Sequence, residues 1–266
     1  MSRGTRPVLD VRDLAFGFGA RRVGRDVTFS LAPAETLAVL GGNGAGKTTL
    51  FRTLLGLLPP LGGTLSLDGA ALGALPPRER ARSLAYVPQQ HVPAFGFTVL
   101  EAVLMGRASL IDTFAHPGHD DYAAAHDALA TLSIEALAAR PVTEISGGER
   151  QLAMIARALA QQAKVLVLDE PTASLDFGNR ARVLAEIDRL RGQGLTILFS
   201  THEPDQALAH ADRALLLADG RVLALDSVTR ALTATNIERL YGTPVRLFPL
   251  PAGRYACVPD DPRAAS

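Results

Sequence analysis

The 266-residue sequence has no tryptophan, a single cysteine and no excess of charge of either sign. The one thiol, Cys257, excludes an internal disulfide framework and fits a reducing compartment. Lysine plus arginine and aspartate plus glutamate both number 27, so the formal net charge is zero. This balance argues against a protein that binds nucleic acid mainly through phosphate electrostatics, and we expect no nucleic acid among its partners.

Long apolar stretches are also missing. The N-terminus has no continuous apolar segment of the length that a signal peptide needs. The uncharged run at residues 53–67 is broken by Pro59-Pro60 and Gly62-Gly63, and it is too short for a membrane-spanning helix. We therefore expect a cytosolic chain that reaches a membrane only through a partner.

Short apolar runs alternate with amphipathic stretches, which is the pattern of an α/β domain. The runs at 36–40, 165–169 and 195–200 are continuous, as expected for strands buried on both faces of a parallel sheet. Residues 181–191 lie between the last two runs and predict a helix. Its apolar face is formed by Val183, Leu184, Ile187 and Leu190.

Other segments carry different patterns. Asp219-Gly220 separates two apolar segments within 214–225 and predicts a hairpin, and the alternation at 64–69 predicts a half-exposed strand. Residues 98–139 are rich in alanine and predict an inserted helical subdomain. Residues 244–266 contain five prolines and predict a loose trailing segment.

The chemistry begins at residues 41–48, GGNGAGKT, which match the phosphate-loop pattern G-x-x-x-x-G-K-[ST]. Glycines let the backbone wrap closely, so that successive N–H groups surround a polyphosphate. We expect Lys47 to reach the β- and γ-phosphates and the Thr48 hydroxyl to ligate Mg²⁺. The expected nucleotide contacts from this segment are Gly41, Gly42, Asn43, Gly44, Ala45, Gly46, Lys47, Thr48 and Thr49.

A second candidate site is the pair Asp169-Glu170 at the end of an apolar run. The carboxyl ends of strands are where α/β sheets build their ligand sites. We expect Asp169 to hold Mg²⁺ through water and Glu170 to polarise the water that attacks the γ-phosphate. An isolated pair of this kind is common among solvated acids, and the phosphate loop is what strengthens the functional interpretation.

Residues 145–151, ISGGERQ, place a serine and two glycines at the start of a helix. Its apolar stripe is Leu152, Ile155, Ala156 and Leu159. Such a helix start can bind an anion through its unpaired N–H groups. The alternative is an ordinary cap formed by Ser146. The residues alone do not explain why a chain with a phosphate loop needs a second anion site.

Seven motifs follow the order found in nucleotide-binding subunits of ATP-binding cassette (ABC) transporters, and the sequence resembles this family over nearly its whole length. They are Phe18 in FGFG, the loop at 41–48, Gln89 in YVPQQ, SGGERQ at 146–151, Asp169-Glu170, SLD at 174–176 and His202 in STHEPDQA. The resemblance implies an α/β P-loop NTPase fold with a mixed sheet core, an antiparallel β subdomain and an inserted helical subdomain. We expect one domain at 1–243, with the helical subdomain at about 91–162, and a C-terminal extension at 244–266.

The resemblance also assigns roles. It implies that Phe18 stacks on adenine, that Gln89 senses the γ-phosphate and Mg²⁺, and that His202 is the switch histidine. It further implies that the signature segment binds the ATP of an opposite subunit, so that two chains meet head to tail as a homodimer. The expected catalytic residues are Glu170, His202 and Gln89. The expected Mg²⁺ ligands are Thr48, Gln89 and Asp169. The further nucleotide contacts are Ser146, Gly147, Gly148 and Asp176.

Departures from the family pattern are small. Gly42 stands where the family often has proline, Ile145 where it usually has leucine, and Phe18 where it usually has tyrosine. These changes remove neither a hydrogen-bond donor of the loop nor a catalytic group. We therefore expect an active site that hydrolyses ATP.

Residues 93–107, 175–179 and 240–247 resemble importers of iron–siderophore complexes, haem, cobalamin and molybdate. This likeness implies an ATPase subunit that drives uptake of a metal complex, with iron–siderophore or haem first and molybdate, tungstate or cobalamin as the alternative. The implied partners are integral-membrane permease subunits and, indirectly, an extracytoplasmic solute-binding protein. The implied location is the cytoplasmic face of the inner membrane, with peripheral attachment.

Three other functions remain open at this stage. A non-transport ABC ATPase would share the nucleotide motifs but usually carries a long coiled-coil insertion or two fused cassettes, and neither is visible here. A P-loop kinase or GTPase leaves ISGGERQ and His202 unexplained. An exporter of the same family shares every nucleotide motif.

Overall fold

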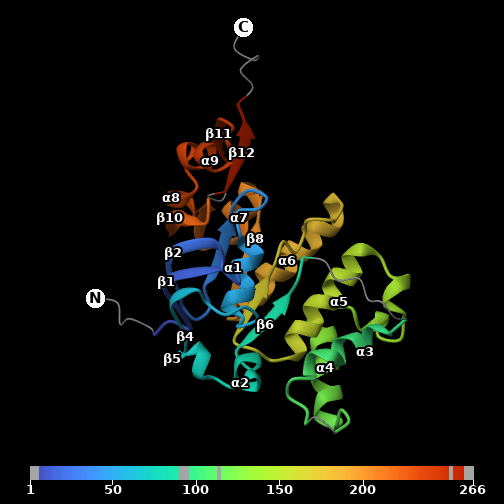
Figure 1. Cartoon of the computed structure of the whole chain (residues 1–266). Helices are drawn as coiled ribbons and strands as arrows, with labels where there is room; N and C mark the ends of the chain where they lie inside the picture. The colour runs from blue at the N-terminus through green and yellow to red at the C-terminus, as the bar shows by residue number, and fades with distance from the viewer. Residues whose placement is uncertain (1–5, 90–95, 113–114, 252–253, 261–266) are drawn as a thin grey trace. The chain divides into compact units, whose positions relative to one another are not determined.

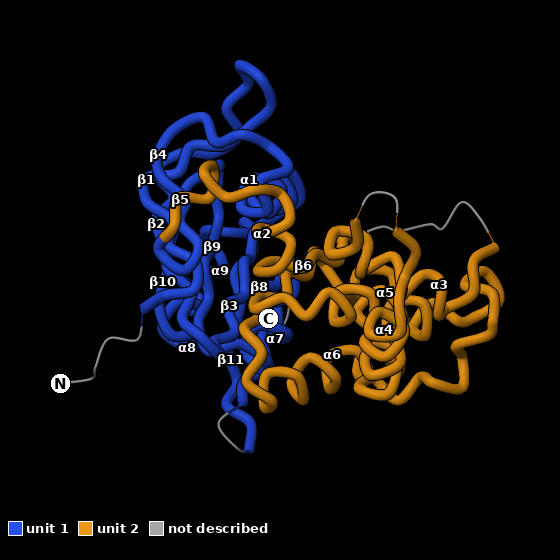
Figure 2. The backbone as a smooth tube through the Cα atoms, turned by 90° about the horizontal axis from the view of Figure 1, so that it is seen from below, with its two compact units in different colours: residues 1–69, 198–266 blue, residues 70–197 orange. Residues whose placement is uncertain are grey.

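The structure is a computed structural model of the whole chain, and it describes residues 6–89, 96–112, 115–251 and 254–260. The chain divides into two compact units (Figure 2). Unit 1 comprises Met1–Gly69 and Leu198–Ser266, and unit 2 comprises Ala70–Ile197. These units differ from the division predicted from the sequence. That division, with a domain at 1–243, its helical subdomain at 91–162 and an extension at 244–266, stays a prediction.

Unit 1 contains an antiparallel sheet in which β1 (Leu9–Phe18) lies between β2 (Arg21–Leu31) and β4 (Gly62–Leu67). Leu9 pairs with Leu31 of β2 on one side and with Leu67 of β4 on the other. The strand predicted at 64–69 is confirmed, because β4 alternates near its end between buried and less buried residues.

A second sheet of unit 1 positions the phosphate loop. In it β3 (Thr36–Leu40) runs parallel to β9 (Arg213–Ala218), and β9 is antiparallel to β10 (Arg221–Ser227). Every residue of β3 is buried, as the continuous apolar run predicts. The strand after β3 in the order is β8 (Thr196–Thr201), whose last four residues belong to unit 1.

The hairpin predicted at 214–225 is confirmed, and its turn has a clear local cause. Asp219 and Gly220 both have positive φ, 48° and 70°. Two such residues in succession form the turn whose twist matches that of antiparallel strands. Asp-Gly is a favoured pair for this conformation, so the turn sets the register of β9 and β10.

The helices of unit 1 are short: α1 (Lys47–Leu54), α7 (Pro204–His210), α8 (Val228–Ala231) and α9 (Ala234–Tyr241). The loose segment expected at 244–266 is wrong for its described part, which forms the hairpin of β11 (Val245–Pro249) and β12 (Tyr255–Pro259). Each strand ends in proline, which is tolerated because a two-stranded ribbon consists of edge strands. The backbone N–H of Cys257 donates to Asp205 Oδ1 at 2.6 Å and holds β12 beside α7.

Unit 2 begins with β5 (Ala70–Ala71) and α2 (Pro77–Ala81) and contains the parallel pair β6 (Leu84–Val87) and β7 (Val165–Leu168). The helix predicted at 181–191 is confirmed within α6 (Phe177–Gly192). All four residues of its predicted apolar face are buried: Val183, Leu184, Ile187 and Leu190.

The helices predicted within 98–139 are confirmed for the described residues. α5 (Gly147–Ala160) packs against α3 (Val99–Leu104) and α4 (His119–Thr131), which lie beside it in Figure 1. The contact surface of α4 consists largely of alanine, and Ala124, Ala125 and Ala128 are buried. Small side chains let the helices approach closely. Across the described ranges, no helix has both the length and the apolar character to cross a bilayer.

Arg107, just after α3, connects these helices. Its guanidinium donates to Asp121 Oδ1 of α4 at 2.9 Å and to the Ala160 carbonyl at the end of α5 at 2.9 Å. Only 12% of the Arg107 side chain and 16% of the Asp121 side chain are exposed. The Gly118 backbone N–H and then Arg107 hold the pKa of Asp121 below its usual range.

We expect Arg107→Ala to lower the free energy of unfolding by about 2–4 kcal/mol, because it leaves a largely buried carboxylate without its cation. Urea unfolding at neutral pH measures this loss. Arg78→Ala is the matched control, since its ion pair with Asp112 is exposed (50% and 81%) and contributes about 0–1 kcal/mol. Equal losses in the two variants would contradict the assigned role of Arg107.

Candidate active site

The phosphate loop leads from β3 directly into α1. Together with Phe18, Arg21 and Val23, residues 43–49 line a cavity of about 320 Å³. Phe18 is 46% exposed at the edge of this cavity. The structure therefore brings the predicted aromatic residue to the predicted loop, within unit 1.

Glycine is required at two positions of the loop for steric reasons. A Cβ on Gly41 would lie 2.6 Å from the Leu217 carbonyl oxygen, and a Cβ on Gly46 would lie 2.8 Å from Val23 Cγ1. Gly46 also has a φ of 99°, which disfavours any side chain. By contrast, a Cβ on Gly42 would meet nothing within 4 Å. Among the loop glycines, the one that departs from the family pattern is thus the one that the surrounding structure does not require.

Lys47 is held across the loop. Its ammonium donates to the Gly41 carbonyl at 2.8 Å and to the Gly42 carbonyl at 3.3 Å, and the residue is only 6% exposed. Burying an ammonium is costly unless oxygen atoms replace its water. Phosphate oxygens are stronger acceptors than carbonyls. The arrangement therefore suits a lysine that moves from the loop to a bound phosphate.

His202 follows β8 and is exposed in the turn before α7. Thr201, at the end of the strand, fixes this turn. Its hydroxyl donates to Gln206 Oε1 and accepts from the Glu203 backbone N–H, both at 3.0 Å. The hydrogen bonds on either side hold the histidine at a strand end, where the prediction placed it.

In unit 2, Asp169 and Glu170 follow β7. Asp169 is 1% exposed, and its Oδ2 accepts a hydrogen bond from the Tyr86 hydroxyl at 3.2 Å. Sequence reasoning missed Tyr86 as part of the site. The available signal was a tyrosine inside an apolar strand, because a buried hydroxyl requires a partner.

Glu170 is held in an uncommon conformation. Its φ is 46°, in the left-handed region that disfavours a long side chain. The Gln89 amide donates to Glu170 Oε2 at 3.0 Å, so two of the predicted catalytic residues are in direct contact. Backbone strain of this kind persists only where the surrounding structure imposes it, and such strain concentrates at functional sites.

The SGGERQ segment starts α5 with reciprocal capping. The Glu149 backbone N–H donates to Ser146 Oγ at 3.2 Å, and the Ser146 backbone N–H donates to Glu149 Oε2 at 2.9 Å. The Ser146 N–H, followed by its hydroxyl, keeps the pKa of Glu149 below its usual range. These hydrogen bonds therefore confirm the alternative interpretation, in which Ser146 caps the helix. The Ser146 hydroxyl accepts from the Glu149 N–H and also stabilises the Glu149 carboxylate, so it can donate to an anion only by giving up that carboxylate.

Asp176 caps α6 in the same way, accepting from the Asn179 backbone N–H at 2.8 Å. The backbone and side-chain amides of Asn179 lower the pKa of Asp176, which is therefore ionised at neutral pH. The predicted magnesium ligands are divided between the units, with Thr48 in unit 1 and Gln89 and Asp169 in unit 2. Their joint role stays a prediction. A hydroxyl and a carboxylate oxygen are suitable ligands for Mg²⁺.

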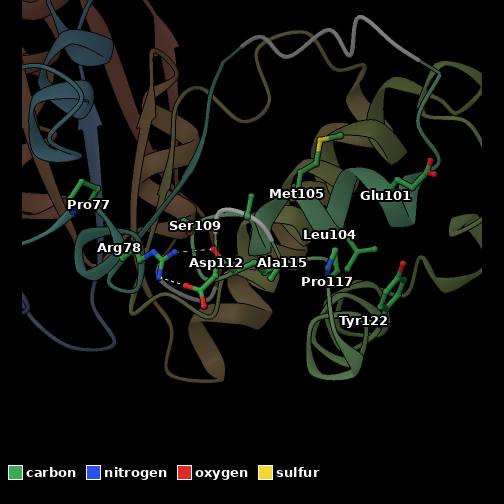
Figure 3. A pocket seen from close by; sticks show the side chains of 12 residues that line it. Pro77, Arg78, Glu101, Leu104, Met105, Ser109, Asp112, Ala115, Pro117 and Tyr122 are labelled. Carbon is green, nitrogen blue, oxygen red and sulfur yellow. Dashed lines mark hydrogen bonds and ion pairs between the residues drawn. The ribbon is translucent and has the colours of Figure 1, made fainter.

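A larger hollow lies elsewhere in unit 2, with a volume of about 690 Å³ (Figure 3). Leu104 at the end of α3, Met105 just after it and Tyr122 of α4 contribute to its lining, while Arg78 pairs with Asp112 at 2.7 Å. Met105 and Tyr122 are each 45% exposed. Residues 93–107, which resemble the permease-facing segment of importers, supply part of this lining, although 93–95 lie outside the described residues.

Comparison with known proteins agrees with these features. The model of the ABC transporter family matches residues 25–173. A Helicobacter pylori protein named as an iron chelatin transport ATP-binding protein is 35% identical over 90% of this chain and 94% of its own length. A Haemophilus influenzae molybdate import ATP-binding protein is 38% identical over 89% of each chain. A solved structure described as a metal-chelate type ABC transporter, in an inward-facing conformation, is 35% identical with a TM-score of 0.84 and covers 97% of this chain and 99% of its own.

Proposed function

The chain belongs to the ABC transporter family, and we propose that it is the ATP-hydrolysing subunit of an importer of a metal complex. The observation that carries this proposal is the phosphate loop, with its obligatory glycines and its lysine held on two loop carbonyls. An iron–siderophore complex or haem is the first candidate for the transported solute. Molybdate, tungstate or cobalamin is the alternative. The similarity to a molybdate import ATP-binding protein supports this alternative.

ATP binds at the phosphate loop in this proposal. The loop N–H groups and Lys47 contact the β- and γ-phosphates, and Phe18 covers the adenine ring. The cavity lined by residues 43–49 and Phe18 supports these contacts, and Gly41 and Gly42 precede it in the loop. When bound, Mg²⁺ neutralises phosphate charge, and Thr48, Gln89 and Asp169 are the residues that would hold it.

Hydrolysis requires a base beside the γ-phosphate, and Glu170 takes that role. Gln89 already contacts its carboxylate and so can orient it. Tyr86 fixes the neighbouring Asp169. His202 lies at a strand end that suits a contact to the same phosphate. These groups position and polarise a water molecule, which is a contribution of roughly 10²–10⁴ in rate for the base.

The SGGERQ segment completes the site of a second copy. The backbone N–H groups of Gly147 and Gly148 belong to the first turn of α5, where helix geometry supplies no partner. The Ser146 hydroxyl adds a donor when it exchanges its hydrogen bond with Glu149 for one to phosphate. We propose that these donors bind the γ-phosphate held by the opposite subunit. Two copies then enclose two ATP molecules, and ATP stabilises the closed dimer by binding it more tightly than the open one.

The partners follow from this role. ABC importer subunits of this kind work with membrane permease subunits, and the hollow lined by Leu104, Met105 and Tyr122 offers this chain an apolar contact surface. We propose attachment at the cytoplasmic face of the cell membrane and an indirect link to a solute-binding protein. The domain division at 1–243 with an extension at 244–266 remains part of the proposal.

We expect Glu170→Gln to lower the ATPase rate by about 10²–10⁴-fold while ATP binding is retained, because the glutamine cannot accept a proton. ATP and Mg²⁺ should then convert the variant into stable dimers, which size-exclusion chromatography measures. Glu135→Gln, at an exposed position of unit 2, is the control and should hydrolyse ATP normally. Normal turnover in Glu170→Gln would remove this residue from the catalytic role.

Crosslinking tests the head-to-tail dimer. In a Cys257→Ser background, Asn43→Cys and Ser146→Cys should form a crosslink between two copies only when ATP is present. Asn43 is exposed and avoids the strain that a side chain would meet at Gly44, where φ is 79°. Replacing Ser146→Cys by Gly73→Cys, at an open position, provides the control. No nucleotide-dependent crosslink between Asn43→Cys and Ser146→Cys would refute the shared site.

Reconstitution with the permease tests the direction of transport. We expect proteoliposomes with ATP at this subunit's face to move a ferric siderophore, haem or molybdate toward that face. The Glu170→Gln subunit should abolish this movement, because a dimer that closes without hydrolysing ATP does not reopen for the next transport cycle. Movement away from that face would favour an exporter, and failure to associate with any permease would favour a non-transport ATPase.

A further inference from the structure

Two helix starts of unit 2 meet at a single glycine. α5 begins after Ser146 and α6 begins after Asp176. An ideal Cβ on Gly148, in the first turn of α5, would lie 2.1 Å from Asn179 Oδ1 and 2.4 Å from Asn179 Cγ. The Asn179 amide therefore lies directly over the Gly148 Cα, at a distance that only glycine permits.

Asn179 is held in this position by Asp176. Its backbone N–H donates to Asp176 Oδ1 and its side-chain Nδ2 donates to Asp176 Oδ2, each at 2.8 Å. Both bonds have an ionised acceptor, which makes them stronger than neutral hydrogen bonds. The short side chain cannot turn away from Gly148 without losing the bond from its amide nitrogen.

The neighbouring glycine shows that this constraint is local. A Cβ on Gly147 would find only Leu175 Cδ2, at 3.8 Å, which is an ordinary van der Waals contact. Both glycines belong to the proposed signature for the second nucleotide. The packing of unit 2 requires glycine at 148 and not at 147.

We propose that Asn179 is a positioning residue that joins the Asp176 segment to the start of α5, so that both meet the nucleotide of a second copy as one rigid surface. Asn179 acts through Gly148 and Asp176 and need not touch the nucleotide itself. The effect of Asn179 on ATP turnover rests on the proposed function. Its contact with Gly148 lies within a single chain and does not depend on that function.

The contact can be tested in the free chain by a double-mutant cycle. We expect Gly148→Ala to lower Tm by about 5 °C through overpacking, and Gly147→Ala, the matched control, to leave Tm within about 1 °C. Adding Asn179→Ala to Gly148→Ala should restore part of the loss, because it removes Oδ1 and Cγ while Asn179 Cβ, 2.8 Å from the new methyl group, remains. Equal stability of the two alanine variants, or no restoration in the double variant, would overturn the contact.

The positioning role is tested by separating nucleotide binding from dimer closure. In the Glu170→Gln background, Asn179→Ala should leave the affinity of the single chain for ATP unchanged. It should weaken ATP-driven dimerisation by roughly 10- to 100-fold, because the signature is no longer held in place. Asn179→Asp, which has the same shape but places a charge against Asp176, should behave like Asn179→Ala.

Asn236→Ala is the matched control for this experiment. Asn236 occupies the same position in α9, with its N–H capped by Thr233 and its amide donating to the Ala231 carbonyl at 2.9 Å. Its loss should leave ATP-driven dimerisation unchanged. Normal dimerisation by Asn179→Ala, or weaker ATP binding by its single chain, would refute the positioning role. A parent Glu170→Gln chain that never dimerises would refute the proposed function, and the thermal cycle would still decide the contact.

Discussion

The constraint on which the site depends is the set of backbone N–H groups at the start of a helix, which have no partners inside the helix. The three relevant helices solve this problem differently. In the described structure α1 has no side-chain cap, whereas Ser146 caps α5 and Asp176 caps α6. The uncapped start of α1 is therefore the one that a phosphate can satisfy most directly. The cap of α5 binds the Glu149 backbone N–H, and the N–H groups of Gly147 and Gly148 before it have no partner inside the helix.

Two residues of the predicted site, one in each unit, are held at a cost to the folded chain. Lys47 is buried and holds two carbonyl oxygens of the loop, while Glu170 has a left-handed backbone and receives the amide of Gln89. The Gly41 and Gly42 carbonyls and the Gln89 amide are neutral partners of these two residues. Neutral partners give way more easily than ion pairs do, because the bonds they form are weaker. Within each unit, such a hydrogen bond can be exchanged for one to a charged group.

Local sequence patterns predicted much of the fold. The five buried residues of β3, the turn at Asp219-Gly220 and the buried face of α6 all follow from short-range rules of periodicity and turn conformation. The proline-rich end of the chain was predicted wrongly as loose. Its hairpin depends on β12 packing beside α7 and on the bond from Cys257 to Asp205, which are contacts between residues about fifty positions apart.

The sequence by itself determined the chemical groups of this protein: a glycine-rich loop with one lysine, a carboxylate pair after an apolar strand, and a serine–glycine helix start. Their spacing along the chain is sufficient to identify them, since each motif is local. Tertiary structure alone decided which groups touch, as in Tyr86 with Asp169 and Asn179 with Gly148. Those partners come from separate elements of unit 2, and only packing in three dimensions brings atoms so distant in sequence within bonding distance.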